Sequence, residues 1–115
     1  MPLIRLTLPK GTNVLHQKSA LEHIQNAVSK ILGKPLAYVQ SILVEAEGML
    51  FAGETDPSVF IEIKSIGGLS PENCKKLSSE CCNIIFSLFS ISPKRIYIEF
   101  TDAKPNLWGW DSTTF

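Results

Sequence analysis

The chain carries a proline at its second position, and this residue type at this place is able to perform acid–base chemistry. Methionine is usually removed when the next residue is small, as proline is, and the mature chain would then begin with a secondary amine. Burial of that amine in an apolar pocket disfavours its charged form and lowers its pKa. A neutral Pro2 nitrogen would then take a proton from a carbon next to a carbonyl and return it elsewhere. Alternatively, Pro2 only permits the removal of Met1 or starts a strand.

Lys34 is a second candidate, because it follows the predicted end of a helix and carries a positive charge. Such a charge would pair with an anionic substrate and would lower the pKa of a nearby amine. In the alternative interpretation, Lys34 is a solvated charge that complements the dipole of the helix. The residues by themselves favour this second interpretation.

Metal, cofactor and disulfide chemistry are not expected. His16 and His23 do not lie at the spacing from cysteines or carboxylates that is typical of a metal site. The cysteines are Cys74, Cys81 and Cys82, an odd number with two adjacent members, which is a poor framework for disulfides. This cysteine usage predicts reduced thiols and a cytoplasmic location.

The composition is that of a single globular domain spanning residues 1–115. Hydrophobic residues make up 44% of the chain and charged residues 19%, and 11 basic residues balance 11 acidic ones. Because no positive charge is in excess, we expect no nucleic-acid partner and no binding to anionic membranes. No apolar run approaches the roughly 18–20 residues of a membrane span, and the first residues do not resemble a secretory signal.

Two stretches of the chain repeat one order of elements, strand, helix and strand. In residues 2–57, apolar residues first alternate, then recur at helical spacing, and then form a β-branched strand. Residues 58–115 repeat this order, and Pro35 and Pro93 lie 58 positions apart. The repeat is one of pattern, since few residues are identical. The predicted strands are 3–8, 38–45, 58–65 and 94–101, and the predicted helices are 14–32 and 71–90.

The order of elements predicts the α+β class, with a four-stranded mixed sheet and two helices on one face. Gly33 is expected to end the first helix, and Ser70 to cap the second. The strands are apolar on both sides, so the face without helices should also be buried, in a symmetric oligomer. Depending on the register, that face carries Leu3 or Ile4, Phe60 or Ile61, and Tyr97 or Ile96.

A set of short motifs adds to this pattern, and their order and spacing are more specific than any one of them. The motifs are the start at Pro2, Gly33-Lys34-Pro35, Met49-Leu50-Phe51-Ala52-Gly53 ending in Asp56-Pro57, Ser65-Ile66-Gly67, Ile91-Ser92-Pro93 with Arg95-Ile96-Tyr97-Ile98, and the tail from Trp108-Gly109-Trp110 to Phe115. Together they closely resemble the macrophage migration inhibitory factor family of the tautomerase superfamily. The resemblance covers essentially the whole chain.

The resemblance implies a homotrimer with three pockets at subunit interfaces. It implies an isomerase that interconverts the keto and enol forms of aromatic α-keto acids such as phenylpyruvate, and of dopachrome-like compounds, without a cofactor. In that family pattern, Pro2 would be the catalytic base, and Lys34 would bind the substrate carboxylate with the backbone at Ile66 assisting. Tyr97 would reach the substrate from the neighbouring subunit. The apolar wall of the pocket would be formed by Leu3, Trp110 and Phe115.

The chain departs from the best-known members of the family at several positions. Ser58 and Ile61 stand where those members carry a Cys-x-x-Cys pair, so thiol–disulfide activity is not expected. Glu99 stands where they have Asn, and a carboxylate near the pocket would stabilise protonated Pro2 and repel an acidic substrate. Trp108 replaces a smaller aliphatic residue and would narrow the mouth of the pocket. We therefore expect weaker turnover of phenylpyruvate than in vertebrate relatives.

The sequence is also compatible with two other functions. One is an interaction protein, a trimer that binds a receptor as a cytokine does and whose pocket is vestigial. The other is a small-ligand-binding regulatory domain built on the same repeat, without catalysis. Relatives are exported without a signal peptide, so the resemblance adds signal-independent secretion to the expected cytoplasmic location.

Overall fold

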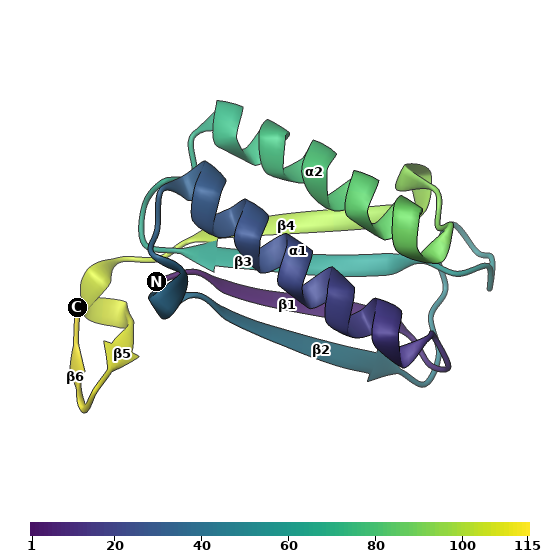
Figure 1. Cartoon of the computed structure of the whole chain (residues 1–115), viewed down its shortest axis with the longest axis horizontal. Helices are drawn as coiled ribbons and strands as arrows, with labels where there is room; N and C mark the ends of the chain where they lie inside the picture. Colours follow the sequence, from purple (N-terminus) through teal and green to yellow (C-terminus); the bar gives the residue numbers. More distant parts are fainter.

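A four-stranded sheet covered on one face by two helices makes up most of the molecule (Figure 1). The computed structural model describes all residues, 1–115. The main elements are β1 (Leu3–Pro9), α1 (Val14–Leu32), β2 (Gln40–Ala46), β3 (Val59–Ser65), α2 (Pro71–Phe89) and β4 (Ile96–Asp102). A small hairpin, β5 (Gly109–Trp110) and β6 (Thr113–Thr114), follows at the C-terminus. The predicted α+β class, with both helices on one face, is confirmed.

The sheet has the order β2-β1-β3-β4 and joins two strand–helix–strand units. Within each unit the strands are parallel, β1 with β2 and β3 with β4. The two units meet through β1 and β3, which are antiparallel. The sheet is therefore mixed, as the repeat predicts.

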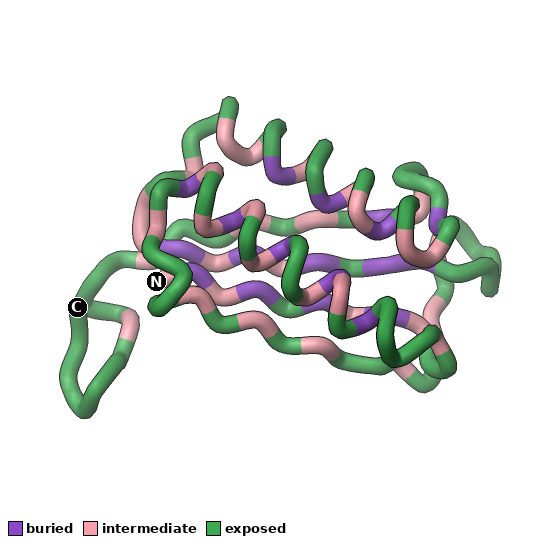
Figure 2. The backbone as a smooth tube through the Cα atoms, in the orientation of Figure 1, coloured by how far each residue is buried: buried purple, intermediate pink, exposed green.

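The helices bury one face of the sheet, and the register decides which residues lie there. Ile4, Ile61 and Ile96 are buried on the helical side, whereas Leu3, Phe60 and Tyr97 lie on the open side. Figure 2 shows the buried positions on the strands beneath the helices. The helices complete this core with Ala20, Ile24 and Val28 from α1 and Leu77, Cys81 and Ile85 from α2.

The open face of the sheet is apolar only in part. Phe60 and Tyr97 are exposed there, with 37% and 66% of their surface accessible. In the middle of this face, Arg5 on β1 and Glu62 on β3 form an ion pair, with 3.0 Å between the Arg5 Nε and the Glu62 Oε2 atoms. The sequence predicts an apolar second face, and this holds at Leu3, Phe60 and Tyr97 but not in the middle, where Arg5 and Glu62 form an ion pair.

Both helices end in the left-handed conformation, but they use different residues to do so. Gly33 ends α1 with φ 65°, as predicted, and glycine adopts this conformation without strain. Ser90 ends α2 with φ 57°, where a Cβ atom is unfavourable. At the start of α2, the Ser70 side chain accepts a hydrogen bond from the Asn73 N–H at 3.1 Å, which confirms the predicted N-cap.

Two predicted strands begin too early, and the error has the same cause in both halves. Residues 38–45 were expected as a strand, but a short 3₁₀ helix, η1 (Leu36–Tyr38), precedes β2. Residues 94–101 were also expected as a strand, but η2 (Pro93–Arg95) precedes β4. A proline stands at the start of each turn: Pro35 is the N-cap of η1, and Pro93 is the first residue of η2, where its fixed φ suits the helix.

The chain shows neither a membrane span nor a metal cluster. No helix is long and apolar enough to cross a bilayer. No three side chains of His, Cys, Asp or Glu lie together in a way that would hold a metal ion.

Replacing Ser90 by glycine is expected to raise the free energy of unfolding by about 0.5–1 kcal/mol, because glycine relieves the strain at a positive φ. Urea denaturation at a fixed protein concentration measures this change. The control variant is Ser87→Gly, within the same helix, where glycine should lower the free energy of unfolding by about 0.5 kcal/mol. Equal effects in the two variants would contradict the explanation.

Candidate active site

A cavity of about 350 Å³ surrounds the N-terminus at one end of the sheet. Its lining residues come from three parts of the chain: the residues before β1, the segment that leads into β2, and the C-terminal segment with the hairpin. Figure 1 shows these three segments at the same end of the sheet. The backbone joins the first two parts, since the Gln40 N–H donates to the Pro2 carbonyl oxygen at 3.1 Å. The lining residues that carry large side chains are Met1, Tyr38, Val39, Trp108, Trp110 and Phe115.

Aromatic rings form one wall of this cavity. Tyr38 meets Trp110 edge to face, with ring centres 5.5 Å apart, and Trp110 stacks on Phe115 at 5.7 Å. The Phe115 N–H donates to the Trp108 carbonyl oxygen at 3.2 Å, which ties the end of the chain to the start of the hairpin. Such a wall suits a flat apolar group, because offset and edge-to-face contacts between rings are favourable.

Pro2 is among the residues that line the cavity, and its side chain is fully buried. The pKa of the Met1 amino group, one residue further out, is lowered first by desolvation and second by the positive charge of Lys34. Both effects disfavour a positive charge at the start of the chain. While Met1 is attached, the Pro2 nitrogen is an amide and has no basic lone pair.

Lys34 is held close to the site by hydrogen bonds at both of its ends. Its backbone N–H donates to the Ser29 carbonyl oxygen at 3.0 Å, and the Ser29 hydroxyl donates to the Lys34 carbonyl oxygen at 2.6 Å. The Lys34 ammonium donates to the carbonyl oxygen of Ile66 at 2.8 Å. An ammonium has three N–H groups, so two remain available for an anion.

Tyr97 and Glu99 do not lie at this cavity within one protomer. In the sheet, Tyr97 is paired with Phe60, and Phe60 with Thr7, five positions along β1 from Pro2. Five positions correspond to about 17 Å. At that far end Tyr97 packs on Phe51, with ring centres 4.7 Å apart.

Glu99 lies on the open face of the sheet, where its carboxylate accepts a hydrogen bond from the Thr101 hydroxyl. Leu3 is half-buried on the same face and does not line the cavity. The structure therefore brings Pro2, Trp108, Trp110 and Phe115 to one cavity and joins Lys34 to Ile66, whereas the other candidates lie on the open face.

Tyr38 is a lining residue that the sequence interpretation missed, because it was placed in a strand. The signal that could have located it is the pairing of parallel strands within one repeat. Leu3 is paired with Gln40, so the residues just before Gln40 must lie beside Pro2. This inference needs the register between β1 and β2, which cannot be read from the sequence.

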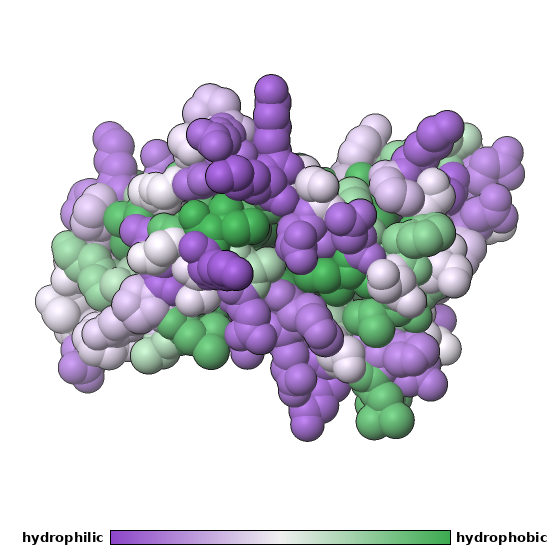
Figure 3. Space-filling model, turned by 45° about the horizontal axis from the view of Figure 1, so that its top comes forward, coloured by the Kyte–Doolittle hydropathy of each residue, from purple (hydrophilic) through white to green (hydrophobic).

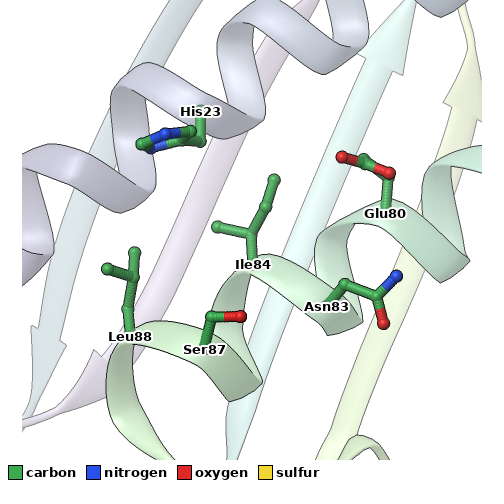
Figure 4. Close-up of a pocket in the computed structure, with 6 residues that line it drawn as sticks. All are labelled: His23, Glu80, Asn83, Ile84, Ser87 and Leu88. Carbon is green, nitrogen blue, oxygen red and sulfur yellow. The ribbon is translucent and has the colours of Figure 1, made fainter.

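A second hollow lies on the helical layer, between the outer faces of α1 and α2 (Figure 4). His23 comes from α1, and Glu80, Asn83 and Ser87 come from α2. The Nδ1 atom of His23 is bonded to the Ser19 carbonyl oxygen at 2.7 Å. This hollow between the two helices contains neither Pro2 nor Lys34. On the surface as a whole, Figure 3 shows hydrophobic patches separated by hydrophilic residues.

Comparison with known proteins identifies relatives of the whole chain. The family model described as macrophage migration inhibitory factor matches residues 1–115. A macrophage migration inhibitory factor homolog of Trichinella spiralis is 31% identical over 116 residues, covering 100% of both chains. The structure of a macrophage migration inhibitory factor-like protein from Entamoeba histolytica superposes with a TM-score of 0.92 at 31% identity, covering 99% of this chain and 98% of the other.

The homologue from Prochlorococcus marinus superposes with a TM-score of 0.91 at 34% identity, covering 98% of each chain. Similarity of sequence and of fold thus extends over the whole length of the chain. The protein belongs to the macrophage migration inhibitory factor family, within the tautomerase superfamily.

Proposed function

We propose that the protein is a cofactor-independent tautomerase of aromatic α-keto acids, with Pro2 as the general acid–base catalyst once Met1 has been removed. Members of the superfamily are generally isomerases. The observation that carries the proposal is the full burial of Pro2 in a cavity with an aromatic wall, at a chain start where burial and the charge of Lys34 lower the pKa of the amino group.

In the proposed reaction, the neutral Pro2 nitrogen removes a proton from the carbon next to the carbonyl of the keto acid. The electron pair of the broken C–H bond forms a carbon–carbon double bond, and the carbonyl oxygen becomes an enolate. The protonated amine returns its proton to that oxygen, which gives the enol. In the reverse direction the same group protonates carbon, so proton and electrons balance without a cofactor.

Lys34 has two functions in this proposal. Its free N–H groups bind the substrate carboxylate, which places the reacting carbon near Pro2. Its charge also favours the neutral form of the Pro2 amine, as it does for the amino group of Met1. The aromatic wall formed by Tyr38, Trp110 and Phe115 takes the ring of the substrate.

We also propose that the protein acts as a homotrimer in which Tyr97 completes the site of a neighbouring subunit. The support is that Tyr97 is 66% exposed and lies at the wrong end of the sheet to reach Pro2 of its own chain. Leu3 and Glu99 lie on the same open face and join the site through the same contact.

Two residues should weaken the turnover of phenylpyruvate. The carboxylate of Glu99 would repel an acidic substrate, and Trp108 narrows the mouth of the cavity around Pro2. The three thiols are free, which favours a reduced, cytoplasmic setting.

Blocking the N-terminus should abolish activity with phenylpyruvate. In a variant with alanine inserted between Met1 and Pro2, the mature chain begins with alanine and the Pro2 nitrogen stays an amide. The Pro2→Gly variant keeps an amine but loses the ring, and we expect kcat/KM to fall by about 100-fold or more. Intact mass confirms processing, and circular dichroism confirms folding. Full activity in the blocked variant would overturn the proposal and favour a receptor-binding role.

Activity should rise with pH, because only the neutral Pro2 nitrogen accepts a proton. Since Lys34 lowers the pKa of an amine at this site, Lys34→Gln should move the acidic limb of the kcat/KM profile to higher pH. Loss of carboxylate binding should raise KM as well. The control is Lys30→Gln on α1, which should leave the profile in place. An unchanged acidic limb in Lys34→Gln would contradict the electrostatic role of this lysine.

Mixing Pro2→Gly with Tyr97→Ala, which should lose activity because the substrate loses its contact with Tyr97, tests whether Tyr97 acts between subunits. In trimers assembled from equal amounts of Pro2→Gly and Tyr97→Ala chains, about one quarter of the sites should combine an intact Pro2 with an intact Tyr97 from a neighbour. Activity should therefore return to about a quarter of the wild-type value. If Tyr97 acts within its own chain, no site is intact, and the mixture stays as inactive as its components.

A further inference from the structure

A single peptide group lies between a carboxylate and an ammonium near the candidate site. The carbonyl oxygen of Ile66 accepts from the Lys34 ammonium at 2.8 Å. The next N–H, that of Gly67, donates to Oδ1 of Asp102 at 3.0 Å. The C=O of Ile66 and the N–H of Gly67 belong to one planar group, so the orientation of one fixes that of the other.

The position of Asp102 in β4 explains how it reaches this peptide. Tyr97, Glu99 and Thr101 lie on the open face, so Asp102 falls in the alternate row, on the helical side. Asp102 is the last residue of β4 and is paired with Ser65, the last residue of β3. Its side chain therefore meets the turn that follows Ser65.

This turn would have freedom to rotate without such a contact. Gly67 and Gly68 have φ angles of 73° and 81°, in a region that glycine enters readily. Rotation of the peptide between Ile66 and Gly67 would point the carbonyl away from Lys34 and the N–H away from Asp102. The two hydrogen bonds are thus lost together or kept together.

Other contacts hold the far side of the turn but not this peptide. The Ser65 hydroxyl donates to the Gly67 carbonyl oxygen at 2.8 Å, and the Asn73 amide donates to the Gly68 carbonyl oxygen at 2.8 Å. Both contacts involve the peptide groups that follow. On the N–H side of the first peptide, Asp102 is the partner.

We propose that Asp102 is a positioning residue for substrate recognition. By holding the N–H of Gly67, it keeps the Ile66 carbonyl directed at Lys34, and that carbonyl in turn directs the two free N–H groups of the ammonium at a carboxylate. A charged acceptor makes a stronger hydrogen bond than a neutral one, and it polarises the peptide so that its carbonyl is a better acceptor. This inference rests on the proposed anion-binding role of Lys34 and does not need turnover.

Binding of an unreactive carboxylate tests this positioning role directly. The probe is 3-phenylpropionate, compared with its uncharged methyl ester by calorimetry. In Asp102→Ala we expect the Kd of the acid to rise about tenfold and that of the ester to stay unchanged. Asp102→Asn keeps an acceptor oxygen and should recover most of the affinity. Glu80→Ala, on the exposed side of α2, also removes one negative charge and should bind both ligands as the wild type does.

A double-variant cycle separates positioning from general damage. If Asp102 acts through Lys34, then adding Asp102→Ala to Lys34→Ala should cause no further loss of affinity for the acid. Equal losses for acid and ester, or additive losses in the double variant, would overturn the proposal. So would a wild-type protein that binds the acid no better than the ester. Failure of the proposed catalysis is seen separately, as turnover that is indifferent to Pro2→Gly while the effect of Asp102 on binding persists.

Discussion

An amine that is removed from water and placed beside a positive charge holds its proton weakly, and the start of this chain lies in such a place. Pro2 is fully buried, and burial and Lys34 both lower the pKa of the amino group next to it. The rest of the site follows from this constraint. A neutral amine is useful only if the substrate arrives with the right carbon beside it, and in the proposed function the aromatic wall and Lys34 provide the two contacts that place it there.

The fold produces this arrangement from local rules. Parallel pairing of β1 with β2 brings the segment after α1 next to Pro2. Gly33 ends α1 in the left-handed conformation, so that Lys34 turns back and meets the end of β3. There the peptide between Ile66 and Gly67 joins the lysine to Asp102. Hydrogen bonds therefore connect the ends of α1, β3 and β4 at the place where we propose that the substrate carboxylate binds.

The helices and strands could be predicted from the sequence, but the contacts between them could not. Alternation and helical spacing predicted both helices and the four main strands, and Gly33 and Ser70 marked helix ends correctly. The 3₁₀ turns were missed because a proline that begins a turn resembles one that precedes a strand. The roles of Tyr38 and Asp102 depend on strand register and on the turn at Gly67, which no local pattern shows.

The state of the Pro2 nitrogen in the mature protein tests the central claim most directly. A chain labelled with ¹⁵N at proline, purified from cells and checked by intact mass, allows that nitrogen to be titrated by NMR. We expect Met1 to be removed and the pKa of Pro2 to lie well below that of a proline amine in water, so that the nitrogen is largely neutral at neutral pH. A nitrogen that stays charged into the alkaline range, or a retained methionine, would contradict this claim.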